Sequence, residues 1–269
     1  MAEVSQRSRR LDQLNWRNPD AYRSLELAER HVFAWEWLRR TPAYQEAWLD
    51  REREAQSPSS GKTGAARFGL IEFANPGGDF ERVRPLWCAE CDPSVVVADI
   101  VDACPTAGNG IDLLAVASLV TLAVDENDNE HLLLSDGKFS VRVDINGGTL
   151  LGAPSLLSYR TSGIARLEAP IATLKRLVAI VLDGRLANSE LQKERRAHRW
   201  ILELRVADAL AAGASYREIA GALYGSLVDD GVWRTGSASI RMRVRRLART
   251  ARLRLKDGAH FDWLRPRRN

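Results

Sequence analysis

The spacing of hydrophobic residues changes from helical to alternating and back to helical along the chain. Helical spacing predicts one helix from about Leu27 to Arg40 and a second from Pro42 to about Glu54. Between about Leu119 and Leu151, apolar and polar residues alternate and are divided by turn sequences such as Asp136-Gly137, which predicts an antiparallel β-meander. From about Ile164 onward the spacing is helical again. The pattern therefore predicts an α+β fold.

Four helices are expected in the C-terminal region. The first has an apolar stripe from Ile171 to Val181, and the second extends from about Gln192 to Ala211. The third begins at Ser215-Tyr216-Arg217-Glu218, a capping-box sequence, and ends at Gly225. The fourth extends from about Ser237 to Lys256. These helices predict a C-terminal all-α domain.

Four parts of the chain are expected. Residues 1–54 form a Trp-rich helical segment, residues 55–66 a linker, residues 67–163 a β-rich middle region and residues 164–269 a basic, helix-turn-helix-like domain. The linker contains Gly61-Lys62-Thr63, but Gln56 stands where a phosphate loop needs glycine, and no apolar strand leads into it. We therefore expect no nucleotide site there.

Charge is distributed unevenly along the chain. The 39 basic and 35 acidic side chains give a net charge of only +4. Residues 1–190 carry −6, whereas residues 191–269 carry +10, and the excess lies in residues 231–269, with 12 basic and 2 acidic side chains. A charge concentrated in this way predicts a polyanionic partner for the C-terminal region.

Composition also excludes several classes of protein. The longest nearly apolar run, Leu113 to Val124, has 12 residues, whereas a membrane-spanning helix needs about 20. The N-terminus has no apolar stretch after its charges, so no secretory signal is expected. Three cysteines are too few for a disulfide framework in a chain of 269 residues. We therefore expect a cytoplasmic protein that does not enter a membrane.

No arrangement of residues predicts catalysis or a cofactor. The four histidines are scattered without a paired carboxylate, and no nucleophile motif is present. Cys88 and Cys91 have the spacing of zinc ligands, with Cys104 downstream, but a structural zinc site needs four ligands. Small buried or incidental cysteines are the favoured interpretation, and metal binding is left open. We expect a protein that is not an enzyme.

The basic helix near the C-terminus carries the strongest functional signal. Ile240, Val244, Leu247 and Ala251 recur at helical spacing and predict one buried stripe, while arginines occupy most other positions and no acidic residue follows Ser237 before Asp257. A short capped helix followed by a basic helix is the arrangement of a helix-turn-helix, whose second helix enters the major groove of DNA. The connection from Gly225 to Gly236 is longer than the usual three or four residues.

This arrangement predicts a set of arginines that contact DNA, because a guanidinium group fits both phosphate oxygens and guanine edges. The basic helix also contains Arg254, which widens its charged flank. The predicted DNA-binding residues are Arg217, Arg234, Arg241, Arg243, Arg245, Arg246, Arg249 and Arg252.

Tryptophan is concentrated near the N-terminus. Trp16, Trp35, Trp37 and Trp48 are four of the eight in the chain. They either hold a small helical hairpin together or form a docking surface, since tryptophan is a favoured anchor at interfaces. Under the second hypothesis these four side chains bind a partner such as RNA polymerase.

Several segments resemble a known family. Asn15-Trp16-Arg17-Asn18-Pro19-Asp20-Ala21-Tyr22, Pro85-Leu86-Trp87, Gly213-Ala214-Ser215-Tyr216-Arg217-Glu218 and Arg241-Met242-Arg243-Val244-Arg245-Arg246-Leu247 are similar to proteobacterial variant helix-turn-helix regulators of integrative and conjugative elements. The family includes rhizobial activators of symbiosis-island excision. The resemblance implies a transcriptional activator of excision and transfer genes that is restrained by a small antiactivator protein.

The sequence thus predicts a sequence-specific regulator that binds double-stranded DNA and needs no cofactor. The alternative is a protein-interaction module, similar to an antiactivator, whose basic helix docks on an acidic partner and does not bind DNA.

Overall fold

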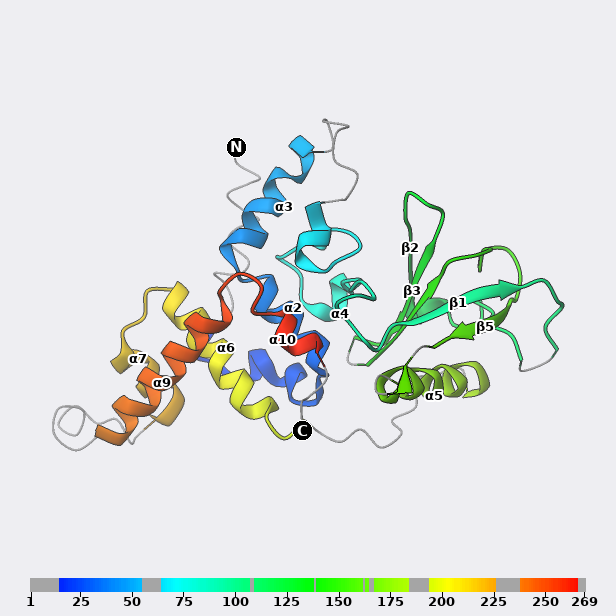
Figure 1. Cartoon of the computed structure of the whole chain (residues 1–269). Coiled ribbons are helices and arrows are strands. Elements are labelled where there is room, and N and C mark those ends of the chain that lie inside the picture. Colours follow the sequence, from blue (N-terminus) through cyan, green and yellow to red (C-terminus); the bar gives the residue numbers. More distant parts are fainter. Residues whose placement is uncertain are drawn as a thin grey trace. The chain divides into compact units, whose positions relative to one another are not determined.

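The computed structural model describes residues 15–54, 64–106, 109–137, 139–161, 163–164, 167–183, 194–225 and 238–265. The chain divides into two compact units, whose parts are drawn in Figure 1. The helical unit consists of Met1–Leu49, Asn75–Asp79 and Gln192–His260. The sheet unit consists of Asp50–Ala74, Phe80–Leu191 and Phe261–Asn269.

The helical unit combines segments from both ends of the chain. Its elements are the 3-10 helix η1 (Pro19–Leu27) and the helices α2 (Arg30–Leu38), α3 (Pro42–Glu54, which continues past the unit's boundary), α6 (Ala197–Ala211), α7 (Tyr216–Tyr224) and α9 (Ala238–Arg254). α6 packs against η1, α2, α7 and α9, and is therefore the central helix of the unit. The N-terminal and C-terminal helices thus share one core.

Local sequence explains how the N-terminal helices begin. Asn18 accepts a hydrogen bond from the backbone nitrogen of Asp20 through its side chain, and Pro19 occupies the first position of η1. The predicted helix from about Leu27 is shorter than expected, because η1 ends at Leu27 and α2 begins at Arg30. The predicted helix from Pro42 to Glu54 is confirmed as α3.

The sheet unit contains five strands and short helices. The strands are β1 (Val96–Val101), β2 (Val120–Val124), β3 (Glu130–Ser135), β4 (Ser140–Ile145) and β5 (Leu156–Arg160), in the order β2-β3-β4-β1-β5. β1 is parallel to β4, and the other neighbours are antiparallel. The helical elements are η2 (Gly64–Phe68), α4 (Phe80–Val83), η3 (Ala117–Leu119), α5 (Glu168–Asp183) and α10 (Phe261–Leu264).

The predicted meander is confirmed for β2, β3 and β4 but is wrong for the sheet as a whole. β1 and β5 were not expected, and β1 makes the sheet mixed. Apolar-polar alternation identifies a strand with one solvated face, whereas β1, although it has six residues like β3 and β4, has apolar residues at all positions except Asp99 and so does not show this alternation. The Asp136-Gly137 turn is where expected, between β3 and β4, and Gly137 has φ of +89°.

One face of the sheet is covered by α5 (Figure 1). Leu177 and Ile180 of α5 are buried against Leu132, Val141 and Val143 of the central strands. Apolar burial of this kind is the main stabilising contribution to the unit.

The opposite face of the sheet contains a buried group of charges. Arg142 donates to Asp144 Oδ1 at 2.8 Å and to the carbonyl oxygen of Trp87 at 3.0 Å, while His131 Nδ1 lies 2.8 Å from Asp144 Oδ1. Burial acts to raise the pKa of Asp144, but His131 and Arg142 together hold it below its ordinary value. These bonds fix the loop that contains Trp87 to the sheet.

The structure groups the segments differently from the expected domain bounds. Residues 164–269 were expected to form one domain, yet α5 belongs to the sheet unit, and the helices of residues 1–54 lie mainly in the same unit as α6, α7 and α9. Helical periodicity shows that a helix has a buried face, but it does not say which element covers that face. The α+β fold class itself is confirmed.

Candidate nucleic-acid interface

The helix α9 presents opposite faces of different chemistry. Val244, Ala248 and Ala251 are fully buried against the neighbouring helices, at the spacing i, i+4, i+7. Ile240 and Leu247, expected in the buried stripe, are half-buried at its margin. The helix contains seven arginines and no acidic residue. It is therefore anchored by small and branched side chains and is cationic over most of the remaining surface.

The predicted DNA-binding arginines of α9 are largely exposed. Arg243, Arg245, Arg246, Arg249 and Arg252 are exposed, and Arg241 is half-buried. Within the described ranges, neither a hydrogen bond nor an ion pair is found for the side chains of Arg243, Arg245 and Arg249. These guanidinium groups are consequently available to a phosphate group.

Two other arginines of this face make local contacts. Arg246 Nε donates to the carbonyl oxygen of Met242 at 3.3 Å, and Arg252 donates to the hydroxyl of Tyr216 at 3.0 Å. The second bond joins α9 to the first residue of α7. Arg217 is exposed on α7, and Arg234 lies outside the described residues, as does the connection from residue 226 to 237. The predicted turn of the helix-turn-helix therefore stays a prediction.

Arg254 differs from the other arginines of α9. Its Nε donates to Glu203 Oε2 at 2.7 Å, and Glu203 of α6 is completely buried. The other oxygen of this carboxylate accepts a hydrogen bond from Arg199 Nε at 3.0 Å. Arg254 also lies over the ring of Trp37, with 5.9 Å between the guanidinium carbon and the ring centroid. The expectation that Arg254 widens the DNA-facing surface is wrong, because this residue ties α9 to α6.

The helix α7 is fixed by the predicted capping box. Ser215 Oγ accepts a hydrogen bond from the backbone nitrogen of Glu218, and Glu218 Oε2 accepts one from the backbone nitrogen of Ser215 at 2.8 Å. The hydrogen bonds from Ser215 lower the pKa of Glu218. Arg17 of the N-terminal segment pairs with Glu218 at 3.3 Å.

The N-terminal segment is attached to α6 by a buried ionic network. Arg40 donates through Nε and a terminal nitrogen to both oxygens of Asp208, at 2.7 and 2.9 Å, and Tyr22 donates its hydroxyl to the same carboxylate at 2.6 Å. Arg205 of α6 donates to the carbonyl oxygens of Trp16 and Arg17. Burial, and then the charge of Asp208, raise the pKa of Tyr22.

Three of the four predicted partner-binding tryptophans lie in the core and are not available as a docking surface. Trp16, Trp35 and Trp37 are buried, with at most 5% of each residue exposed, and Trp48 is half-buried. Trp35 packs edge-on against Tyr44, and its indole nitrogen donates to the carbonyl oxygen of Gly78. Trp16, Trp35 and Trp37 are therefore core residues, in agreement with the other interpretation of the aromatic cluster, whereas the role of Trp48 stays a prediction. Aromatic density alone could not distinguish a core from an interface.

The cysteines do not form a metal site in the described part of the chain. Cys88 and Cys91 are half-buried and Cys104 is exposed, and no cluster of three or more potential metal ligands occurs in the described residues. Burial, together with the hydrogen bond to Cys91, raises the pKa of Cys88 to about 12. Among the described helices, none combines the length and the apolar character needed to cross a bilayer.

Comparison with known families matches both ends of the chain. Residues 15–70 match a family model described as a proteobacterial transcriptional regulator-like domain. Residues 156–258 match one described as the DNA-binding domain of a T6SS transcription factor. A search of the curated proteins found no match. The two matches indicate a DNA-binding transcription regulator, and the second includes all of α9.

Proposed function

We propose that the chain is a sequence-specific DNA-binding regulator in which α9 enters the major groove. The observation that supports this most strongly is the exposed face of α9, where Arg243, Arg245 and Arg249 have no carboxylate partner in the described residues. A helix on a protein surface that serves only solubility normally intersperses acidic residues among its basic ones. The match of residues 156–258 to a DNA-binding domain supports the same proposal.

The two halves of α9 have different roles in this proposal. Residues at the N-terminal end of a recognition helix contact base edges, whereas later residues approach the backbone. Arg245 therefore reads bases, and Arg249 and Arg252, which follow it on the same flank of α9 at i+4 and i+7, contact phosphates. Met242, which is half exposed, supplies an apolar surface suited to a thymine methyl group. Arg217 and Arg234 act as flanking phosphate contacts.

Fluorescence anisotropy with labelled duplex DNA tests the proposal. With about six phosphate contacts, log affinity should fall with log salt concentration at a slope near −5. The double variant Arg245→Ala, Arg249→Ala should bind about 100-fold more weakly at constant salt. Because Arg249 is assigned to a phosphate group, its removal should also make the slope shallower by about 1.

The matched control is the double variant Arg23→Ala, Arg160→Ala. It removes the same charge from two exposed arginines that already pair with Asp20 and Asp99. DNA affinity within about twofold of wild type is expected, since surface ion pairs contribute little. Equal losses of DNA affinity in both double variants would mean that net charge, and not the position of the arginines on α9, determines binding. Undiminished binding by the α9 variant, or no binding to any duplex at low salt, would favour the alternative of a module that docks on an acidic protein.

We further propose that the regulator activates excision and transfer genes of a mobile element in the cytoplasm, with RNA polymerase and a small antiactivator as protein partners. The resemblance of the Asn15–Tyr22 and Arg241–Leu247 segments to regulators of such elements supports this role. Footprinting upstream of the neighbouring genes, followed by transcription in vitro, tests it. Increased transcript from a footprinted promoter is expected, and decreased transcript would indicate a repressor.

The proposal also states that the protein is not an enzyme. Incubation of bound duplex with Mg²⁺ should therefore leave both strands intact. Cleavage that depends on the protein would contradict it.

A further inference from the structure

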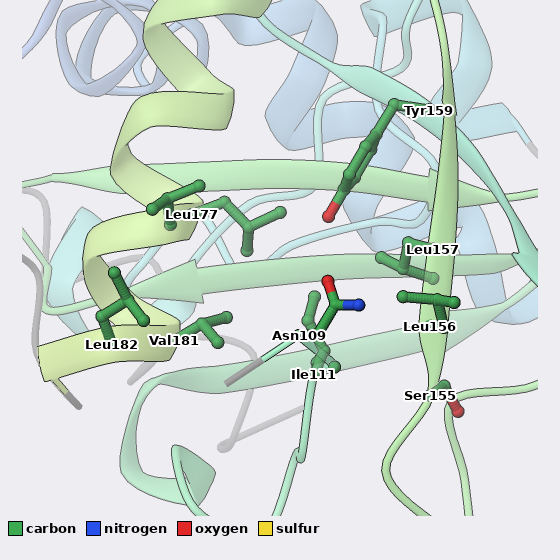
Figure 2. A pocket seen from close by; sticks show the side chains of 11 residues that line it. Asn109, Ile111, Ser155, Leu156, Leu157, Tyr159, Leu177, Val181 and Leu182 are labelled. Carbon is green, nitrogen blue, oxygen red and sulfur yellow. The ribbon is translucent and has the colours of Figure 1, made fainter. Parts of the chain in front are cut away.

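A pocket of about 230 Å³ lies within the sheet unit, between α5 and β5 (Figure 2). One wall consists of residues from the last two turns of α5, among them Leu177, Val181 and Leu182, and the other of Leu156, Leu157 and Tyr159 from β5. Ile111 and its neighbours close the base, where Ile111 forms an isolated bridge with Ser155. β5 is the last strand of the sheet, so the pocket lies at the sheet's margin.

The lining is apolar and uncharged. Leucine, isoleucine and valine supply most of it, and no Asp, Glu, Lys or Arg is found among the described residues that line the pocket. Several of these apolar side chains are exposed, including Val178 and Leu182, which have 56% and 66% of their surfaces accessible. Adjacent exposed apolar groups around a concavity are typical of a ligand site.

Two polar groups face each other across this lining. Figure 2 shows the hydroxyl of Tyr159 and the side-chain amide of Asn109 pointing toward one another within the pocket. In the described part of the chain, neither side chain makes a hydrogen bond. Tyr159 is partly exposed, with 41% of its surface accessible, and a phenol with an ordinary pKa of about 10 is already a neutral donor at physiological pH; burial raises the pKa further. The pocket therefore offers one phenol and one amide, both with hydrogen-bonding capacity, in an apolar surrounding.

We propose that this pocket binds a small neutral molecule with an apolar body about the size of one ring and a single hydrogen-bonding group such as a carboxamide. The size follows from the volume, because an apolar cavity of about 150 Å³ holds benzene, and 230 Å³ leaves room for one substituent. The preference for a neutral ligand follows from the lining, which contains no charged group that could pair with a carboxylate or an ammonium group. Asn109 and Tyr159 recognise the polar group. The inference goes beyond DNA binding and does not depend on it.

Three probes that differ in one substituent test the proposal: benzamide, toluene and benzoate. Ligand-detected NMR with the full-length chain measures their dissociation constants. Benzamide should bind with a Kd of about 1 mM or tighter, which is within reach of a ligand of this size. Toluene should bind about fivefold more weakly, because it lacks the hydrogen bonds. Benzoate should bind at least tenfold more weakly than benzamide, because its charge is uncompensated.

Three variants test where and how benzamide binds. Val178→Trp places an indole at the mouth of the pocket and should abolish benzamide binding, whereas Ile171→Trp, an equally large change on the exposed surface of α5 away from the pocket, should leave it within twofold of wild type. Tyr159→Phe should weaken benzamide binding part of the way toward that of toluene, because Asn109 remains, without changing the affinity for toluene. Equal thermal melting of the variants confirms that they fold.

Several results would overturn the proposal. These are no benzamide binding, equal binding of the three probes, or benzamide binding that survives Val178→Trp. The experiment contains no DNA, so its failure leaves the proposal for α9 unaffected, and loss of DNA binding leaves the pocket unaffected.

Discussion

The arginines in the interior of the helical unit and those on the exposed face of α9 are the same residue in opposite electrostatic settings. In the interior, Arg39 and Arg40 contact Glu36 and Asp208, with no more than 8% of any of these side chains exposed. On α9, Arg243, Arg245 and Arg249 are exposed, and no acidic partner is found for them in the described residues. The difference teaches that the number of arginines does not measure a DNA interface. What distinguishes a candidate DNA-binding arginine is that it is exposed and has no carboxylate beside it.

The largest effect is expected from Arg40→Ala, which would leave Asp208 and Glu36 as buried charges with too few partners. The free energy of unfolding should fall by about 4 kcal/mol, because breaking a buried ion pair exposes the full cost of desolvating its partner. Urea denaturation measures the change. Arg23→Ala is the control, since Arg23 pairs with Asp20 at the surface and its removal should cost less than about 0.5 kcal/mol. Similar values for the two variants would contradict the distinction between interior and surface.

A comparison within α9 sharpens the same distinction. Arg254→Ala should destabilise the protein by about 3 kcal/mol, since the buried carboxylate of Glu203 would then keep, among the described residues, only Arg199 as an ion-pair partner. Arg252→Ala should change stability by about 1 kcal/mol or less, because its bond to Tyr216 is exposed, but it should weaken DNA binding about tenfold. Denaturation and anisotropy measured on both variants separate the roles. If Arg252→Ala lowered the free energy of unfolding as much as Arg254→Ala, the distinction between structural and DNA-binding arginines on α9 would be wrong.

Much of the fold could be predicted from the sequence where local chemistry decides it. Pro42 at the start of α3, the Ser215–Glu218 capping box and the alternation in β3 and β4 are set by residues close together in the chain. The partners of each element could not be predicted in this way. The apolar stripe of α5 could pack against a sheet or against another helix, and its sequence does not distinguish the two. The pairing of β1 with β4 joins residues more than 40 positions apart.

The candidate interface was predictable in part for the same reason. The cationic face of α9 follows from spacing alone, because Val244 and Ala251 mark the buried side. The exception, Arg254, depends on Glu203, which is 51 positions away. The tryptophans were ambiguous because both a core and an interface favour them, and only burial distinguishes the two.

A smaller effect is expected from acid, since protonation of a carboxyl group leaves its hydrogen-bonding capacity in place. Burial acts to raise the pKa of Glu36, but the guanidinium groups of Arg39 and Arg40 hold it below its ordinary value. As the pH falls below about 5, the unfolded chain therefore binds a proton before the folded chain does, and stability decreases. Urea midpoints at pH 7 and pH 4 should show this loss, and Glu36→Gln should be less stable at pH 7 but lose less between the two values. If the variant lost as much stability as the wild type between pH 7 and pH 4, the ionisation of Glu36 would not contribute to the pH dependence.

The smallest effect is expected at the start of α7. There Glu218 pairs with Arg17 of the N-terminal segment, an arginine that is exposed, like those of α9, but also paired, like those of the interior. Its partner Glu218 is already held by Ser215 through the capping box, so the ion pair adds little. Ser215→Ala should lower the free energy of unfolding by about 1 kcal/mol, Ser215→Gly by only a few tenths, and Arg17→Ala by less than about 0.5 kcal/mol. Thermal and urea denaturation of the three variants give this order. DNA affinity should stay within twofold of wild type for both serine variants, since neither alters α9. A larger loss for Arg17→Ala than for Ser215→Ala would mean that exposed arginine pairs, as well as buried ones, hold this unit together.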